Sequence, residues 1–165
     1  MNHLKLIALK DFPLIQPKDD LASIITKSIH LNKITIEPGD VIVIAQKVIS
    51  KSEDRFQVVN EIEPSQEAID LAKELKRDPS FIQIILNESN KIISTEKNVI
   101  IVEHKLGFIN INAGLDRSNI SQERDIVLLL PENPSKSAND LQLKISTSFK
   151  KDISIIITDS MTRPY

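Results

Sequence analysis

Two spacings of apolar residues run along this chain, and each spacing predicts a different kind of element. Apolar residues at positions 21, 24, 25 and 29 recur at helical spacing directly after Asp19 and Asp20. Acidic residues before such a stripe are typical of a helix start, so an amphipathic helix is predicted here. The same spacing, or an aspartate followed by proline, predicts three further helices: 64–76, from Asp78–Pro79 to residue 90, and around Leu141 and Ile145.

Short apolar runs predict the strands. Residues 41–45 form a continuous apolar run behind the turn at 37–40, and residues 155–158 form another, so both are predicted to be buried strands. Residues 46–55 are predicted to be a loop or a short helix. Further strands are predicted at 4–9, 91–95, 98–105, the start of 106–119, 125–130 and 152–159.

This order of elements favours an α/β (α+β) fold with one mixed sheet and flanking helices. No linker, repeat or low-complexity tract interrupts the 165 residues, so a single domain spanning 1–165 is predicted.

Composition excludes several classes of protein. A net charge of −2 offers no electrostatic attraction for nucleic acid or an anionic membrane. The absence of cysteine rules out disulfides and thiolate metal sites. No apolar run approaches the roughly 20 residues that cross a bilayer, and the N-terminus lacks a signal-peptide cleavage site. We therefore expect a cytoplasmic protein without nucleic-acid or membrane partners.

Glycine is scarce, with only three in the chain. Neither GxxxxGK[ST] nor GxGxxG occurs, so the fold is predicted to be neither a P-loop nor a Rossmann fold. Any nucleotide would have to be bound by other means.

Polar side chains follow three of the predicted strands. After the run 41–45 come Gln46, Lys47, Ser50 and Lys51. The lysines could contact phosphates, but for this segment alone a solvated loop with ordinary surface lysines is the favoured explanation.

The second polar segment surrounds Gly114. It contains a carboxylate with neighbouring amide, hydroxyl and guanidinium groups: Asn112, Asp116, Arg117, Ser118 and Asn119. Such oxygen donors suit magnesium or manganese, but the same residues could instead satisfy local backbone donors in an Asx-turn. The residues alone leave both interpretations open.

The third polar segment ends the sequence, where Asp159 and Ser160 follow the last strand. Ligands collect at the carboxyl ends of strands in open α/β sheets, so a site is predicted there. The alternative, an N-cap, is weaker because few residues remain to form a helix. The histidines, His3, His30 and His104, lack ligand-like spacing and are interpreted as surface or structural residues.

Taken together, these segments resemble the coenzyme F420-0:gamma-glutamyl ligase family over essentially the whole chain. The most specific motif is "GFININAGLDRSN" (107–119), paired with "TDS" (158–160); "FPLIQPKDDL", "GDVIVIAQKVISKSEDR", "DPSFIQIILNES" and "VLLLPENPSKSA" accompany them in family order. The resemblance implies a ligase that activates a carboxylate with GTP as an acyl phosphate and then adds L-glutamate. It also implies two divalent ions, manganese or magnesium, potassium as an optional cofactor, and a homodimer.

Residue by residue, the resemblance implies metal ligation by Asp116, Asp159 and Ser160. It implies nucleotide contacts at two short segments and one separate residue: Pro13, Leu14 and Ile15, then Gln46, Lys47 and Lys51, and Asn119. No catalytic residue beyond the metal ligands is assigned.

The chain departs from the family pattern at four positions. Met161, Thr162 and Tyr165 replace the phenylalanine, glycine and tryptophan of the family, and Gln46 replaces a small hydroxyl residue or a histidine. These departures bear on the acceptor more than on the nucleotide. The family continues beyond the arginine–proline pair, so we expect the chain to be incomplete at its C-terminus. Two alternatives are a non-catalytic nucleotide- or metal-binding dimer and a ligase acting on a different carboxylate.

Overall fold

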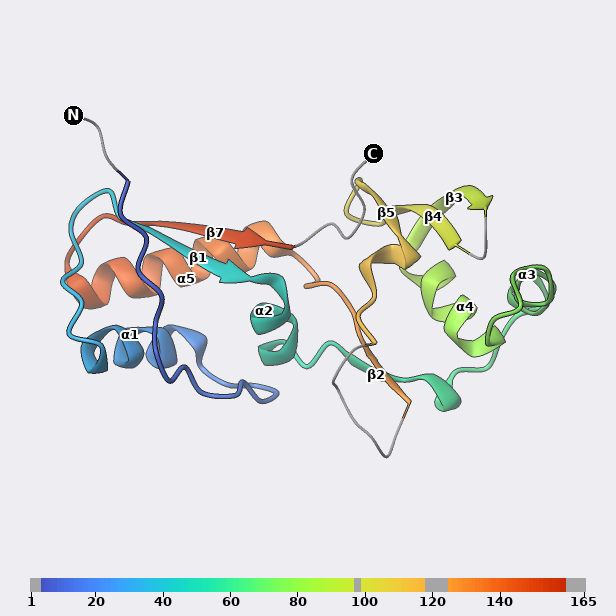
Figure 1. The fold of residues 1–165 in the computed structure, drawn as a ribbon, viewed down its shortest axis with the longest axis horizontal. Helices are drawn as coiled ribbons and strands as arrows, with labels where there is room; N and C mark the ends of the chain where they lie inside the picture. Colours follow the sequence, from blue (N-terminus) through green and yellow to red (C-terminus); the bar gives the residue numbers. More distant parts are fainter. Residues whose placement is uncertain (1–3, 97–98, 118–124, 160–165) are drawn as a thin grey trace. The chain divides into compact units, whose positions relative to one another are not determined.

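The computed structural model describes residues 4–96, 99–117 and 125–159, which group into two compact units (Figure 1). Unit 1 comprises residues 1–54 and 131–165, and unit 2 comprises residues 55–130. Each unit has its own hydrophobic core. Unit 2 is therefore an insertion in the sequence of unit 1.

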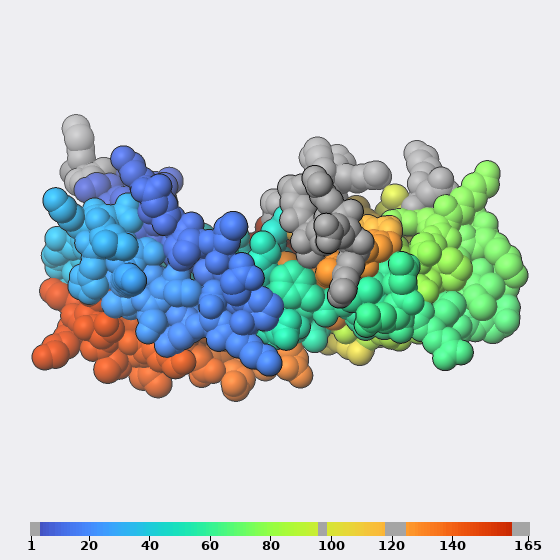
Figure 2. Space-filling model, turned by 90° about the horizontal axis from the view of Figure 1, so that it is seen from below, coloured from blue at the N-terminus to red at the C-terminus, as the bar shows by residue number. Residues whose placement is uncertain are grey.

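Unit 1 is built on a parallel pair of strands covered by helices. Strands β1 (Val41–Ala45) and β7 (Ser154–Thr158) pair in parallel, and Val41 lies opposite Ser154. Helices α1 (Leu21–Leu31) and α5 (Pro134–Phe149) pack together and share a core with the strands. Figure 2 shows α1 in blue directly against α5 in orange-red. The short helix α2 (Gln46–Ser52) begins where β1 ends.

The parallel pair is buried on one face only, which corrects the prediction of buried strands at 41–45 and 155–158. Ile42, Ile44 and the isoleucines of β7 at 155 and 157 contribute to the core. On the other face Val43 is 58% exposed and Ile156 is 48% exposed. A continuous apolar run indicates a strand, but it does not reveal how many faces the rest of the chain covers.

The strand predicted at residues 4–9 is wrong. These residues have no strand partner among the described residues, and Leu4 and Leu6 are largely exposed. Hydrogen bonds hold the chain in place just after this segment. The Lys10 backbone N–H donates to the Asn32 Oδ1 atom at 2.9 Å, and the Asn32 Nδ2 atom donates to the Lys10 carbonyl at 3.2 Å. Apolar composition favours extended backbone, but a strand also needs a neighbour to bond with.

Unit 2 combines two helices with two antiparallel sheets. Strand β2 (Phe56–Val58) pairs with β6 (Ile126–Leu128), and the second sheet has the order β3–β4–β5. The remaining elements are η1 (Val59–Glu61), α3 (Gln66–Leu75), α4 (Pro79–Asn87), β3 (Ser89–Glu96), β4 (Val99–His104), β5 (Ile109–Ile111) and η2 (Asn112–Gly114).

Capping residues place the helix starts where the sequence predicts them. The Asp78 carboxylate accepts from the Phe81 backbone N–H at 2.8 Å, and Pro79 occupies the first position of α4. Asp20 caps α1 in the same way through Ser23. All four predicted helices are confirmed. The sequence also predicts a tight turn at 96–98, which lies partly outside the described residues.

The α+β class is confirmed. Parallel and antiparallel pairing both occur, as a mixed sheet requires, but they occur in separate small sheets. That residues 1–165 form one domain stays a prediction. In the parts of the chain that the structure describes, no helix combines the length and the apolar character needed to cross a membrane.

Two neighbouring residues of β1 provide a test of the one-sided burial of this strand. Replacing buried Ile44 with alanine removes core contacts and should lower the free energy of unfolding by about 2–4 kcal/mol. In a single copy of the chain, replacing Val43 with threonine should change it by no more than about 0.5 kcal/mol, because that side chain faces solvent there. Denaturant unfolding measures both. A large loss in Val43→Thr would show that the outer face is covered in solution.

Candidate functional site

The backbone before Asp116 turns through three consecutive left-handed residues. Asn112, Ala113 and Gly114 have φ angles of 48°, 54° and 68°. A Cβ atom added at Gly114 would lie 2.8 Å from the Leu130 Cδ1 atom and 2.9 Å from the Asn110 Nδ2 atom. Both the backbone conformation and the close approach of these two side chains therefore favour glycine at position 114.

After this turn, Asp116 lies beside strand β6 and pairs with its residue Leu128. The Asp116 backbone N–H donates to the Leu128 carbonyl at 3.0 Å, and the Leu128 N–H donates to the Asp116 carbonyl at 2.8 Å. Asp116 itself is half-buried. Two reciprocal backbone bonds on a packed strand fix the position of its Cα atom, as a ligand residue requires.

Arginines surround the same loop. Arg77 donates to the Asn112 Oδ1 atom at 3.1 Å, so it braces the left-handed turn. The guanidinium groups of Arg77 and Arg117 lie 4.8 and 5.2 Å from the centre of the Phe81 ring. Burial, and then the nearby Arg117 charge, lower the pKa of Arg77. Arg117 forms a two-pronged ion pair with Asp125, so its described contacts are structural.

The second predicted metal ligand, Asp159, follows β7 and is exposed. Asp116 belongs to unit 2 and Asp159 to unit 1. Their convergence on shared ions stays a prediction, and Ser160 and Asn119 lie outside the described residues. Within those residues, no group of three or more acidic or histidine side chains gathers as a metal site. Two carboxylates nevertheless match the oxygen donors that magnesium and manganese prefer.

The predicted nucleotide segment at Pro13 divides between core and surface. Ile15 is buried in the core of unit 1, whereas Pro13 and Leu14 are exposed, Leu14 by 84%. The Ile15 side chain therefore contributes to folding. Of the three residues of this predicted segment, Pro13 and Leu14 present side chains that could line a site.

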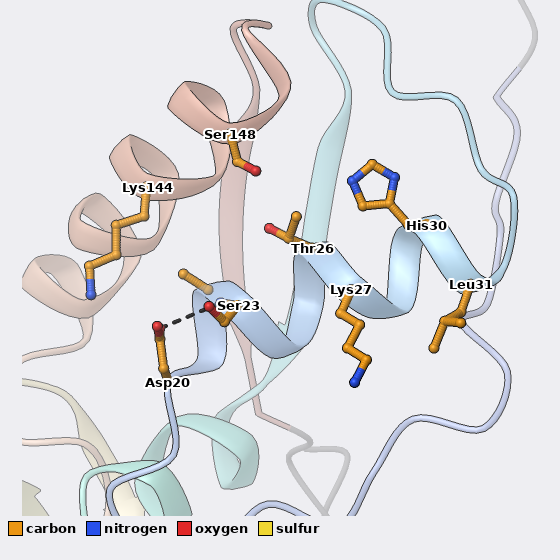
Figure 3. A pocket seen from close by; sticks show the side chains of 9 residues that line it. Asp20, Ser23, Thr26, Lys27, His30, Leu31, Lys144 and Ser148 are labelled. Carbon is orange, nitrogen blue, oxygen red and sulfur yellow. Dashed lines mark hydrogen bonds between the residues drawn. The ribbon is translucent and has the colours of Figure 1, made fainter.

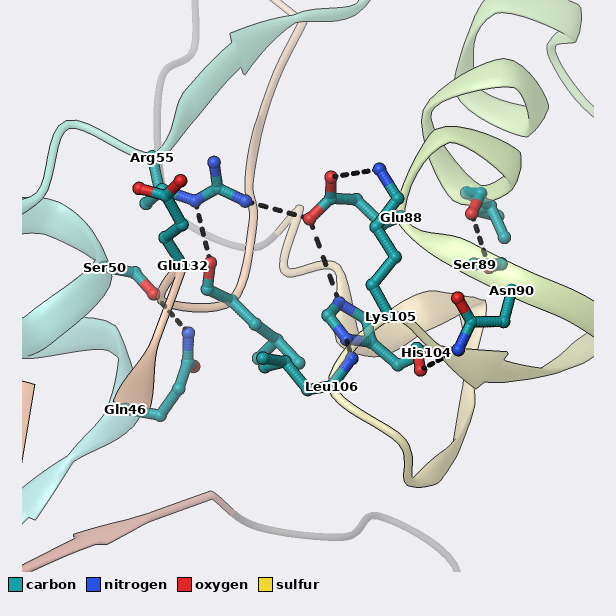
Figure 4. Close-up of polar contacts among 12 residues, drawn as sticks. Gln46, Ser50, Arg55, Glu88, Ser89, Asn90, His104, Lys105, Leu106 and Glu132 are labelled. Atoms are coloured by element: carbon teal, nitrogen blue, oxygen red, sulfur yellow. Dashed lines mark hydrogen bonds and ion pairs between the residues drawn. The ribbon is translucent and has the colours of Figure 1, made fainter. Parts of the chain in front are cut away.

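Gln46, Lys47 and Lys51 lie on helix α2, so the segment is the short helix that one of the two predictions allowed and not a loop. Gln46 is buried, and its Nε2 atom donates to the Ser50 hydroxyl at 2.5 Å (Figure 4). The departure from the family pattern at position 46 thus has a packing role. Lys47 is exposed and Lys51 is half-buried.

An open groove that the sequence did not predict runs between α1 and α5 (Figure 3). Polar side chains line it, including Asp20, Lys27 and Lys144. Asp20 already serves as the cap of α1 through the Ser23 N–H. The lysines lie on the exposed surfaces of their helices, so the groove offers no buried polar group that would select a ligand.

Sequence reasoning also missed a charged network inside unit 2 (Figure 4). The Glu88 carboxylate lies 2.8 Å from the Arg55 Nη2 atom, 3.8 Å from the His104 Nε2 atom and 3.9 Å from the Lys105 Nζ atom. Glu88 is 14% exposed and His104 about 2%. The network is therefore a largely buried carboxylate surrounded by nitrogen atoms.

His104 is neutral in this network. Its Nδ1 atom accepts from the Leu106 N–H at 2.9 Å, which leaves the proton on Nε2, the atom that faces Glu88. Burial lowers the pKa of His104, with smaller contributions in the same direction from Arg55 and Lys105, whereas Glu88 opposes them. The interpretation of His104 as structural is confirmed. The signal was available, because period-two alternation puts residue 104 on the same face as Ile100 and Val102.

Gly114→Ala tests the left-handed turn. The added methyl group would meet Leu130 and Asn110 in a backbone conformation unfavourable to alanine, so the free energy of unfolding should fall by about 1–3 kcal/mol. Denaturant unfolding measures the loss. Gly107→Ala is the matched control: its φ of 88° is also left-handed, but nothing lies within 4 Å of the added atom. Equal losses in the two variants would contradict a steric role for position 114.

The neutral, buried state of His104 predicts a pH dependence of stability. In the unfolded state the His104 imidazole binds a proton below its ordinary pKa of about 6.5. In the folded state, where this pKa is lowered, it binds the proton only at a lower pH. The stability that neutral, buried His104 contributes is therefore complete above about pH 6.5. It declines as the pH falls below that value, because protons then bind preferentially to the unfolded state. His104→Asn, which keeps an acceptor near Leu106, should flatten the decline in unfolding free energy between pH 7 and 5. A slope that survives in His104→Asn would contradict the assignment.

Known proteins resemble this chain over most of its length. Residues 10–165 match the profile of the family described as F420-0:Gamma-glutamyl ligase. A coenzyme F420:L-glutamate ligase of Methanococcus maripaludis strain S2 is 41% identical over 94% of this chain and 60% of the relative. Its counterpart in Methanothermobacter thermautotrophicus is 33% identical over 98% of this chain and 64% of the relative. The chain thus spans about 60% of the length of these relatives. It belongs to the F420-0:gamma-glutamyl ligase family.

Proposed function

We propose that this chain acts in a GTP- and divalent-metal-dependent ligase that adds L-glutamate to the carboxylate of a coenzyme F420-type acceptor. The observation that supports this most directly is the family match over residues 10–165. The similar proteins are named coenzyme F420:L-glutamate ligase, and the chain spans about 60% of their length. The activity therefore belongs to the proposal.

The proposed reaction has two steps. An acceptor carboxylate oxygen attacks the γ-phosphorus of GTP, and GDP leaves with the electron pair of the broken P–O bond. The glutamate amine then attacks the carbonyl carbon of the acyl phosphate; phosphate leaves, and the new amide loses the former amine proton. A carboxylate by itself is a poor electrophile, so its activation is the purpose of the nucleotide.

The chain's own part in this reaction is to hold charge in place. Phosphoryl transfer depends on positioning and on neutralising the phosphate oxygens. Manganese or magnesium ions, when bound, would supply that neutralisation, and potassium could add to it. Asp116, Asp159 and Ser160 would hold the ions. The left-handed turn at 112–114 and the two backbone bonds to Leu128 restrain the backbone of Asp116, which supports this assignment.

The nucleotide contacts belong to the same proposal. Lys47 and Lys51 would meet phosphate groups as point charges, and Pro13, Leu14 and Asn119 would border the nucleotide. The buried side chains of Ile15 and Gln46 would support these contacts indirectly. Ile15 packs in the core, and Gln46 donates a hydrogen bond to Ser50.

A homodimer in the cytoplasm completes the proposal. Large apolar side chains remain exposed on unit 1, among them Val43 and Ile156 on the outer face of the parallel strands. Parallel strands are normally covered on both faces, and a second copy of the chain would provide such a cover.

A second candidate is a non-catalytic protein that binds nucleotide and metal. A third keeps the ligase chemistry with a different carboxylate acceptor, as the altered C-terminal residues suggest. Detection of product by mass spectrometry separates these candidates: glutamyl transfer to the F420-type acceptor supports the ligase, and binding without product supports the second.

Replacement of the two aspartates tests the metal site. Asp116→Asn and Asp159→Asn each keep the side-chain size but remove a carboxylate, so each should weaken manganese-dependent GTP binding at least about 10-fold. Calorimetric titration of GTP in the presence of manganese measures this. Asp140→Asn, which alters an exposed carboxylate on α5, is the matched control. Binding that tolerates both site changes would refute the metal assignment.

A further inference from the structure

The buried carboxylate of Glu88 joins two parts of unit 2 that both lead to Asp116. It sits at the end of α4 and receives Arg55 from the segment before β2 and His104 from the end of β4 (Figure 4). Among the described residues, Lys105 also faces it, and that side chain is more than half exposed. A charge with this little exposure needs its partners, so the three elements are held in one arrangement.

One arm of the network leads to Asp116 through β6. Besides the ion pair with Glu88, Arg55 donates from its Nε atom to the Leu130 carbonyl at 2.9 Å. The Arg55 carbonyl accepts from the Leu129 N–H at 2.9 Å. The preceding residue, Leu128, exchanges two backbone hydrogen bonds with Asp116. Arg55 therefore anchors the strand end against which Asp116 is paired.

The other arm leads to Asp116 through the turn between β4 and β5. The His104 ring accepts from the Leu106 N–H and stacks on Phe108 at 5.2 Å with planes 3° apart. The His104 backbone N–H donates to the Phe108 carbonyl at 2.8 Å. Strand β5 follows Phe108 directly and runs into the left-handed turn before Asp116. His104 therefore shapes the start of the loop whose end carries the carboxylate.

We propose that Arg55, Glu88 and His104 are positioning residues that hold Asp116 and the residues 112–117 around it in the geometry needed to bind a divalent cation. None of the three touches the cation in this proposal; they act through the backbone on either side of Asp116. The inference rests on the proposed function, because that function assigns the metal to Asp116. It adds residues that the family resemblance did not assign.

Glu88→Gln and Arg55→Lys are the informative variants. Glu88→Gln keeps the shape of the side chain but removes the charge that both arms share. Arg55→Lys keeps the positive charge but cannot donate to Glu88 and to Leu130 with the same two-nitrogen fork. Glu103→Gln is the matched control, because Glu103 lies on β4 beside His104 and forms a more exposed ion pair with Lys91 at 3.0 Å.

Two measurements on the full chain separate positioning from general stability. Calorimetric titration with Mn²⁺ alone, well below the melting temperature of every variant, should show about a 10-fold or greater rise in Kd for Glu88→Gln and Arg55→Lys. Glu103→Gln should bind like the unaltered chain. Hydrogen exchange should be faster at residues 109–117 in the first two variants, with exchange in α3 unchanged.

The outcomes distinguish this inference from the proposed function. Unchanged Mn²⁺ affinity in folded Glu88→Gln or Arg55→Lys overturns the positioning role. Absence of Mn²⁺ binding to the unaltered chain overturns the metal assignment, and the exchange measurement then decides alone: selective acceleration at 109–117 supports positioning of the loop. Exchange that rises equally across unit 2, or not at all, overturns it.

Discussion

The pairing of residues 55–58 with residues 126–130 is the constraint on which the rest of this structure depends. The chain leaves unit 1 after Asp54 and re-enters it at Pro131, so both ends of unit 2 must lie close together. Strands β2 and β6 meet this requirement through their antiparallel ladder, which the Leu129–Arg55 backbone bond extends. This closure lowers the entropic cost of pairing β1 with β7, which are separated by more than one hundred residues.

The same closure also builds the candidate site. Strand β6 has β2 on one side and Asp116 on the other, so the residues that close unit 2 also support the predicted metal ligand. The tight contact between Gly114 and Leu130 adds a steric constraint at the same strand end. A residue held by backbone bonds and close packing loses little entropy when it binds a ligand, which favours placing a metal ligand there.

Buried charge, not glycine-rich backbone, organises this part of the molecule. The chain has too few glycines for a phosphate-cradling loop, and unit 2 instead contains the Glu88 network and two arginines against Phe81. Such groups are costly to bury unless they are paired, and they therefore favour a single arrangement of the elements that carry them. The proposed chemistry is consistent with this design, because it needs fixed carboxylates more than a flexible loop.

The sequence by itself determined the helices, most of the strands and the family of this protein. Local signals decide helix starts, as at Asp78–Pro79, and the residues around Gly114 carry the family motif, because both depend on neighbours within a few positions. Tertiary structure alone decided that residues 4–9 have no strand partner, that β1 is covered on one face, and that Gln46 turns inward to Ser50. It alone brought Arg55, Glu88 and His104 together, although alternation along β4 already placed His104 on the buried face. The physical reason is that burial and ion pairing depend on which distant segments meet, and periodicity along one segment carries no information about its partner.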